Sequence, residues 1–171
     1  MKNKAAFLDR DGTIVEDQNY KNNYNKIKIL KDAVKALLIL KRLKFKLIIV
    51  TNQSGIAKKI TTRNKVDTFN KRLKEILKEH KIIISKIYVC PHSVIESCKC
   101  RKPKSKFATL AKKKFNLNLK NSIVIGDKIS DKLFGKKYNI KGYLLNKKTS
   151  IYDIAKRIEK KKSQSHKKKF Y

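Results

Sequence analysis

Short apolar runs alternate along the chain with stretches in which apolar residues recur at helical spacing. The runs are nearly continuous, which is typical of strands that are buried on both faces of a parallel sheet. Turn residues or polar residues follow each run, so each strand is predicted to be short. The predicted strands are 5–8, 45–50, 87–89, 122–126 and 142–145.

The helical stretches lie between these runs. Asp32 is expected to cap the first helix, and Thr61 or Thr62 the second. A third helix is predicted from about Ser105 to Phe115. The apolar positions expected to face the core are Val34, Leu37, Leu38 and Leu40 in the first helix, and Val66, Phe69, Leu73, Ile76 and Leu77 in the second.

Strands that alternate with helices predict βαβ units, and hence an α/β fold with one doubly wound, Rossmann-like parallel sheet. At 171 residues the chain is long enough for one domain with a hydrophobic core. We expect this domain to span residues 1–155. Residues 156–171 are mostly Lys with Ser and Gln, and we expect a basic C-terminal tail whose end frays.

Charge is the unusual feature of the composition, because 46 Lys and Arg oppose 13 Asp and Glu, a formal net charge of +33. A lysine-dense surface attracts phosphate-bearing partners nonspecifically. Lysine is nevertheless spread over the whole length, together with abundant Ile and Asn. This pattern favours a general compositional bias over a designed binding stripe.

Targeting signals and membrane spans are not predicted. The N-terminal segment has no long apolar region with a small-residue cleavage site, and no run approaches the ~18 apolar residues of a membrane span. All three cysteines fall within residues 90–100, unlike the spread, even-numbered set of a secreted disulfide framework. We therefore expect a soluble protein of the cytoplasm.

Four polar residues stand where predicted strands end: Asp9, Thr51, Cys90 and Asp127. Ligands of doubly wound sheets bind outside the carboxyl ends of the strands, so these residues predict one site. Asp9 and Asp11 place two carboxylates on one turn, where a cation such as Mg²⁺ has to neutralise them before a phosphate can approach. One carboxylate can then attack phosphorus while the other moves protons. An isolated Asp-x-Asp would more often be an ordinary polar turn.

The sequence around these positions resembles the four motifs of the haloacid dehalogenase-like phosphohydrolases. The matching segments are Leu8-Asp9-Arg10-Asp11-Gly12-Thr13, Thr51-Asn52-Gln53-Ser54-Gly55, Arg101-Lys102-Pro103 and Gly126-Asp127-Lys128-Ile129-Ser130-Asp131. The resemblance implies Asp9 as the nucleophile, Asp11 as the acid and base, and Thr51 and Lys102 as groups that hold the transferring phosphoryl group. It also implies a Mg²⁺ site of Asp9, Asp11 and Asp127.

The cysteines form a second pattern with His92. Cys90, His92, Cys98 and Cys100 make Cys-x-His-x5-Cys-x-Cys, a three-sulfur, one-nitrogen set suited to tetrahedral Zn²⁺. Four protein ligands leave no position for substrate, so we expect a structural zinc in a loop of residues 90–103. Such a loop would fix Arg101 and Lys102, which follow Cys100 directly. The alternative is three buried thiols beside an incidental histidine.

This combination resembles the histidinol-phosphatase-like branch of the family, and within it the D-glycero-D-manno-heptose 1,7-bisphosphate 7-phosphatases, from about residue 5 to residue 145. The resemblance implies no large cap domain, a monomer, and hydrolysis of the sugar's 7-phosphate on the way to nucleotide-activated heptose for lipopolysaccharide core. The substrate-binding residues it implies are Asp17, Gln18, Asn19, Tyr20, Thr51, Asn52, Gln53, Ser54, Arg101, Lys102 and Lys128.

The chain departs from these relatives at two places. Asn19 stands where they usually carry Gly, and Lys58-Lys59 stands where they usually carry Arg-Gly. The loss of glycine costs about 1 kcal/mol if the backbone there needs a positive φ, and Asn tolerates that conformation better than Lys.

Three other functions compete with this interpretation. A histidinol-phosphate phosphatase would share the catalytic and zinc residues. A DNA 3′-phosphatase would suit the positive charge, but the zinc loop and the lack of interleaved aromatic residues argue against it. A nonenzymatic polyanion-binding protein would have no use for Asp9, Asp11 and Asp127 at one sheet edge.

Overall fold

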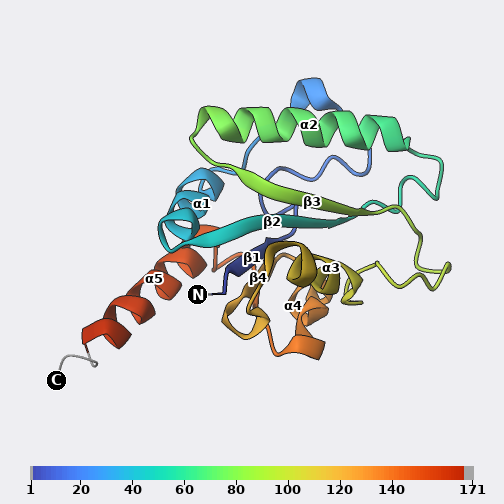
Figure 1. Ribbon diagram of the computed structural model, residues 1–171. Coiled ribbons are helices and arrows are strands. Elements are labelled where there is room, and N and C mark those ends of the chain that lie inside the picture. Colours follow the sequence, from blue (N-terminus) through green and yellow to red (C-terminus); the bar gives the residue numbers. More distant parts are fainter. Residues whose placement is uncertain (1, 168–171) are drawn as a thin grey trace.

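A five-stranded parallel sheet forms the centre of the protein in the computed structural model, which describes residues 2–167 (Figure 1). The strands are β1 (Lys4–Leu8), β2 (Phe45–Asn52), β3 (Ile84–Cys90), β4 (Ile123–Gly126) and β5 (Lys141–Leu144). Their order across the sheet is β3-β2-β1-β4-β5, and every neighbouring pair is parallel. The predicted α/β fold with a doubly wound sheet is confirmed.

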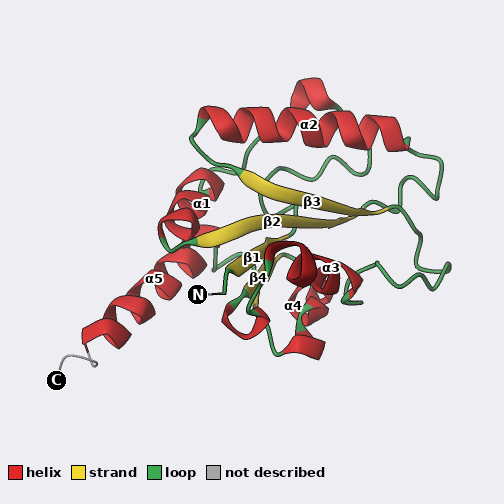
Figure 2. Ribbon diagram, viewed as in Figure 1, coloured by secondary structure: helices red, strands yellow, loops and turns green. Residues whose placement is uncertain are grey.

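Helices cover both faces of this sheet. Helices α1 (Ala33–Arg42), α2 (Arg63–Glu79) and α5 (Ile151–Lys167) share one hydrophobic core with the first face. Helices α3 (Lys106–Phe115) and α4 (Ile129–Phe134) cover the other face, across the sheet from α2 (Figures 1 and 2). Three short 3₁₀ helices complete the set, at Tyr24–Lys26, Leu119–Asn121 and Lys136–Tyr138.

Strand β1 shows why the apolar runs are continuous. Ala6 and Leu8 pack into the core beneath α1, α2 and α5, whereas Ala5 and Phe7 pack into the core beneath α3 and α4. Side chains of a strand alternate between the faces of its sheet, so a strand covered on both sides needs apolar residues at every position.

The three predicted helices are present, with two departures from prediction in α1. Thr62 caps α2, and its Oγ1 accepts a hydrogen bond from the Lys65 backbone N–H at 3.2 Å. Asp32 occupies the N-cap position of α1, although its side chain makes no capping bond. Leu38 was expected in the core but is 37% exposed. Its neighbours Leu37 and Leu40 fill the space beneath the helix, and Leu38 falls beyond the edge of the buried stripe.

The expected domain boundary after residue 155 falls inside helix α5, which continues to Lys167. Ile154 and Ile158 of α5 are buried in the same core as α1, and Arg42 Nη2 of α1 lies 2.6 Å from Glu159 Oε1. The last residues of the expected tail, 168–171, lie outside the described residues. Within residues 2–167, no helix is long and apolar enough to span a bilayer.

Candidate active site

The carboxyl ends of β1, β2 and β4 meet at one edge of the sheet, and a cavity of about 400 Å³ opens there. Asp9 follows β1, and Asp127 follows β4, which pairs directly with β1. Thr51 and Asn52 end β2 on the other side of β1. The predicted convergence of these residues is therefore a consequence of the strand order β2-β1-β4.

Lys102 is the buried cation of this site. Its Nζ donates to Asp9 Oδ1 at 2.5 Å and to the Val50 carbonyl at 2.6 Å, and lies 2.6 Å from Asp131 Oδ1. The two carboxylates outweigh the cost of burial and raise the pKa of Lys102, so the ammonium stays charged although the residue is only 5% exposed. Asn52 fixes the backbone here, because its Oδ1 accepts from the Lys102 N–H at 3.0 Å.

Three carboxylates lie close enough together to hold a metal ion. Oxygens of Asp9, Asp127 and Asp131 are all within 4.8 Å of one another. Asp131 is already engaged by Lys102 and by the backbone N–H of Lys128, at 3.0 Å. Asp127 Oδ1 is buried without a hydrogen-bond partner among the described residues. Burial and the charge of Asp9 raise the pKa of Asp127 to about 6.

This group fits a hard divalent cation. An unpartnered buried carboxylate oxygen beside two other carboxylates is costly unless a positive charge compensates it. Gly12 makes the room: with φ of 74°, a Cβ at this position would come within 2.5 Å of Asp127 Oδ2. The first motif and the fourth motif are thus in direct van der Waals contact.

The carboxylate of Asp11, which the sequence suggested as a third magnesium ligand, is not part of this group. Gln53 Nε2 donates to Asp11 Oδ2 at 2.7 Å, and Arg10 Nε lies 3.1 Å from both carboxylate oxygens. Its oxygens are thus engaged by Arg10 and Gln53. Asp11 still lines the cavity, as its predicted role in proton transfer requires.

Arg10 was not singled out in the sequence, yet it organises the floor of the cavity. The side chain is 2% exposed and its guanidinium lies 4.3 Å from the centroid of the Phe69 ring. Beyond Asp11, its Nη1 donates to Asn70 Oδ1 at 2.9 Å and its Nη2 to Asn22 Oδ1 at 2.6 Å. No local sequence signal connects these residues, because the contacts depend on how α2 packs over β1.

The predicted substrate residues are only partly assembled around the cavity. Those that line it are Asp17, Gln18, Tyr20, Thr51, Asn52, Gln53, Arg101, Lys102 and Lys128. Asn19 and Ser54 do not line it. Asn19 lies in a turn with φ of 51°, and Ser54 Oγ lies 3.4 Å from the hydroxyl of Tyr20. Lys128 Nζ is 4.0 Å from Asp17 Oδ2, so these two side chains bring opposite charges close together at the cavity.

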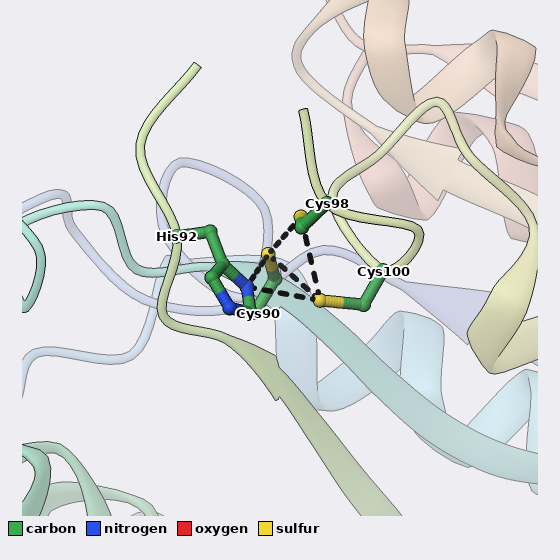
Figure 3. Close-up of side chains that lie close together, drawn as sticks. All are labelled: Cys90, His92, Cys98 and Cys100. Carbon is green, nitrogen blue, oxygen red and sulfur yellow. Dashed lines mark hydrogen bonds between the residues drawn. The ribbon is translucent and has the colours of Figure 1, made fainter. Parts of the chain in front are cut away.

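Cys90, His92, Cys98 and Cys100 converge at the end of β3 (Figure 3). Cys100 Sγ lies 3.2 Å from Cys90 Sγ, 3.3 Å from His92 Nδ1 and 3.6 Å from Cys98 Sγ. A tetrahedral site with metal–sulfur bonds of about 2.3 Å needs ligand separations of roughly 3.8 Å. The observed separations are somewhat shorter than this value, and the four side chains are close enough together to hold a metal ion once they move slightly apart.

The pKa values of Cys90 and Cys98 are shifted in opposite directions. Burial raises the pKa of Cys90 strongly. Burial also acts on Cys98, but hydrogen bonds from the backbone of Cys100 and Arg101 and from the neighbouring thiols outweigh it and lower the pKa of Cys98 to about 7. Backbone N–H groups directed at a sulfur stabilise the thiolate, the form that binds metal.

The cysteine loop also reaches the catalytic cavity. Arg101 Nη1 donates to the His92 carbonyl at 3.1 Å, and Arg101 and Val94 both line the cavity. Val94 was not predicted; it is 74% exposed and gives this wall an apolar side chain.

Comparisons with known proteins agree with this geometry. Residues 4–170 match the family model described as polynucleotide kinase 3 phosphatase. The chain belongs to the haloacid dehalogenase-like phosphatases. A probable D-glycero-D-manno-heptose-1,7-bisphosphate 7-phosphatase of Thermoplasma volcanium is 40% identical over 73% of this chain and 86% of its own length.

Other members of this phosphatase family share the chain's fold or sequence. The histidine biosynthesis bifunctional protein of Blochmanniella floridana is 34% identical over 83% of this chain, which spans only 41% of that larger protein. A D,D-heptose 1,7-bisphosphate phosphatase from B. bronchiseptica, crystallised with magnesium and phosphate, has a TM-score of 0.81. At 19% identity, over 92% of this chain and 99% of that one, it establishes a shared fold.

Proposed function

We propose that this phosphatase hydrolyses the 7-phosphate of D-glycero-D-manno-heptose 1,7-bisphosphate and leaves the 1-phosphate for nucleotide activation, towards lipopolysaccharide core. One observation carries the proposal of phosphoryl transfer: the carboxylate of Asp9 faces a cavity of about 400 Å³ with the ammonium of Lys102 at 2.5 Å. The choice of sugar is supported by the heptose bisphosphatase relative of 40% identity and by the segment 17–20, which contributes to the cavity wall.

In the first step, an oxygen of Asp9 attacks phosphorus as the bond between phosphorus and the sugar oxygen breaks. The leaving alkoxide takes a proton from Asp11, and the phosphoryl group remains on Asp9 as an acyl phosphate. In the second step, Asp11 removes a proton from water, and the resulting oxygen attacks phosphorus. The acyl phosphate bond breaks, which releases inorganic phosphate and restores Asp9.

Lys102 and Thr51 assist both steps. Lys102 balances the charge of Asp9 and of the transferring phosphoryl group in a site that largely excludes water. Thr51 lines the same cavity, and its Oγ1 accepts a hydrogen bond from Gln53 Nε2 at 2.8 Å. Because these donors are already in place, little reorganisation is needed when charge develops.

Asp9 and Asp127 would hold the magnesium ion, with Asp131 oriented behind them by Lys102. When bound, Mg²⁺ neutralises the carboxylates and the phosphoryl oxygens. The unpartnered Asp127 Oδ1 supports this assignment.

Cys90, His92, Cys98 and Cys100 would hold a structural zinc ion, because four protein ligands close the coordination sphere. Its role would be to fix the loop that carries Arg101 and Lys102. Within this proposal the enzyme acts as a cytoplasmic monomer on a free sugar bisphosphate.

The main competing substrate is histidinol phosphate, since the Blochmanniella floridana relative is named for histidine biosynthesis. A 3′-phosphorylated nucleic acid is a third candidate, in line with the description of the matching family model. Besides Arg10 and Lys102, the cavity is lined by Arg101 and Lys128. These two further cations favour a small substrate with a second phosphate over histidinol phosphate, which has one phosphate and a cationic amine.

Phosphate release from these three substrates tests the proposal. We expect the highest kcat/KM for the heptose bisphosphate, with magnesium, and a loss of at least about 10⁴-fold in Asp9→Asn, because the amide cannot form the covalent intermediate. Faster turnover of histidinol phosphate would overturn the choice of sugar. Activity that survives in Asp9→Asn would overturn the mechanism.

A further inference from the structure

Carboxylates are distributed unevenly over the surface, although lysine is spread along the whole chain. Between Glu96 and Asp153 the only acidic residues are Asp127 and Asp131, and both belong to the candidate active site. This segment contains α3 and α4, which cover one face of the sheet. That face therefore has a dense positive charge with no carboxylate of its own on its exterior.

The opposite side of the molecule is different, because its cations are partly neutralised. On α2, Arg63 pairs with Asp67 at 2.9 Å and Arg72 with Glu75 at 3.3 Å. On α5, Glu159 pairs with Arg42 of α1 at 2.6 Å. The general lysine bias of the sequence accounts for cations on both sides, but it does not explain why the anions lie on one side.

Three adjoining hollows run across the face formed by α3 and α4. Hollows of about 550 Å³ and 570 Å³ share Lys104, Ser105 and Lys137, and a third, of about 380 Å³, shares Lys137 with both. We call these three adjoining hollows together the lysine trough. Its walls carry Lys99, Lys104 and Lys106 at one end, Lys136 and Lys137 in the middle, and Lys2, Lys112 and Lys120 at the other end.

No carboxylate competes with a ligand for the ammonium groups of the trough, although Lys104 Nζ donates one hydrogen bond to the Ser97 carbonyl, at 2.9 Å. All eight lysines are exposed, and none of them takes part in an ion pair among residues 2–167. The trough is also separate from the catalytic cavity, since the two have no lining residue in common.

We propose that the lysine trough binds the phosphodiester backbone of a nucleic acid strand, as a ligand that does not enter the active site. An elongated groove with cations at intervals fits a linear chain of phosphates better than it fits a flat membrane surface. Two aromatic residues line the trough: Phe134 is buried, at 1% exposed, and the hydroxyl of Tyr138 lies 2.6 Å from Thr109 Oγ1, so neither ring is presented as a stacking surface. Without a stacking platform the trough contacts phosphates alone, so binding is independent of base sequence.

A pair of matched triple variants tests this proposal. Lys104→Gln, Lys136→Gln and Lys137→Gln neutralise the trough, and Lys71→Gln, Lys74→Gln and Lys78→Gln remove the same charge from the exposed surface of α2. The probe is a fluorescein-labelled oligothymidine of about 20 nucleotides without a terminal phosphate, which gives the catalytic site no ester to cleave. Binding is measured by fluorescence anisotropy at several salt concentrations.

The trough variant should bind the strand about 10–100-fold more weakly at roughly 0.1 M salt, and the slope of log K against log salt should fall by about 2. The α2 variant should lose less than about threefold. Equal losses in both variants would show that net charge alone is responsible and would overturn the proposal. Unchanged binding in the trough variant would overturn it as well.

Two further measurements complete the test. Phosphate release from the sugar bisphosphate should be unchanged in both variants, which also shows that they are folded. If the trough triple variant does not fold, the single variants Lys137→Gln and Lys74→Gln repeat the comparison with one charge removed from each surface.

Vesicles of phosphatidylcholine with phosphatidylserine test a membrane as the alternative partner. If the trough variant loses vesicle binding but keeps strand binding, the trough is a membrane site and the proposal is wrong.

Discussion

Asp127 belongs to the candidate active site, and its ionisation lowers the stability of the folded protein. Its carboxylate is half-buried beside Asp9 and Asp131, and its pKa is raised from 3.8 to about 6, first by burial and then by Asp9. A carboxyl group with a raised pKa in the folded state destabilises the fold once it ionises. The cost is absent below about pH 4, grows up to about pH 6 and is complete at neutral pH.

Asp127→Asn should therefore stabilise the magnesium-free, zinc-loaded protein at about pH 7.5, by on the order of 1 kcal/mol after allowance for solvent screening. The gain should shrink towards pH 5, and thermal unfolding at both pH values measures it. Adding Mg²⁺ should reverse the order, because only the wild type gains binding free energy. A variant that is less stable than wild type without Mg²⁺ would contradict the proposed electrostatics.

At the scale of elements, several turns and helix ends have a left-handed backbone without glycine. The chain contains only five glycines, yet nine other residues between positions 2 and 167 have positive φ. Lys44 and Lys81 follow the ends of α1 and α2, where glycine is the usual residue. Asn19 and Lys59 occupy the two positions where the resembling phosphatases usually carry glycine, and both have positive φ, of 51° and 57°. The general bias of the sequence towards Lys and Asn has thus placed these residues at turn positions where their backbone is strained.

Lys59→Gly should stabilise the fold by about 0.5–1 kcal/mol, because glycine adopts this conformation without steric cost. Urea denaturation of the purified proteins measures the change. The neighbouring substitution Lys58→Gly is the matched control. Lys58 is not among the positive-φ residues, and its ammonium lies 5.6 Å from the Tyr20 ring centroid, so glycine there should destabilise the protein. Equal effects at both positions would argue against backbone strain.

Helix α5 belongs to the core and not to a tail. Ile158 is 7% exposed and packs in the same cluster as α1 and β2. Ile158→Ala should cost about 2–4 kcal/mol in unfolding free energy, since it leaves a cavity beneath α1. Ile129→Ala, at a helical position that is 58% exposed, should cost less than about 1 kcal/mol. If both variants unfold at the same urea concentration, residues beyond 155 do not contribute to the domain.

At the scale of the whole molecule, the cysteine centre connects the end of β3 to Lys102. Asn52 and the Arg101–His92 hydrogen bond fix the end of the loop, and the proposed zinc ligands would fix its middle. A loop of this length without secondary structure would otherwise be poorly fixed. Loss of the metal should therefore affect both stability and catalysis.

Elemental analysis should find about one zinc atom per wild-type chain, and Cys98→Ser should remove most of it. We expect the unfolding temperature to fall by more than about 10 °C and phosphate release to fall at least tenfold, because Arg101 and Lys102 lose their support. Lys99→Ser, between two ligands, should keep both zinc and activity. Full zinc occupancy in Cys98→Ser would refute the assigned ligand set.

Much of this architecture could be predicted from local pattern. Backbone periodicity decides which residues share a face, so the five apolar runs indicated the five strands. Burial on both faces holds for the central strands β1, β2 and β4, whereas the edge strands β3 and β5 are partly exposed. Helix α4 was missed because six residues are too few for a period to be recognised. Helix α5 was missed because its lysine-rich sequence looks solvent-exposed, and only one stripe of it is buried.

The candidate residues Asp9, Asp127 and Lys102 and the four proposed zinc ligands could be recognised from short segments, because side-chain type and local spacing are properties of the sequence. Which carboxylates meet could be seen only in the folded protein: Asp131 joins Asp9 and Asp127, whereas Asp11 pairs with Arg10 and Gln53. The tertiary structure alone also placed the lysines of distant segments along one trough. The physical reason is that side-chain type is local, whereas charge pairing and burial depend on how helices pack over the sheet.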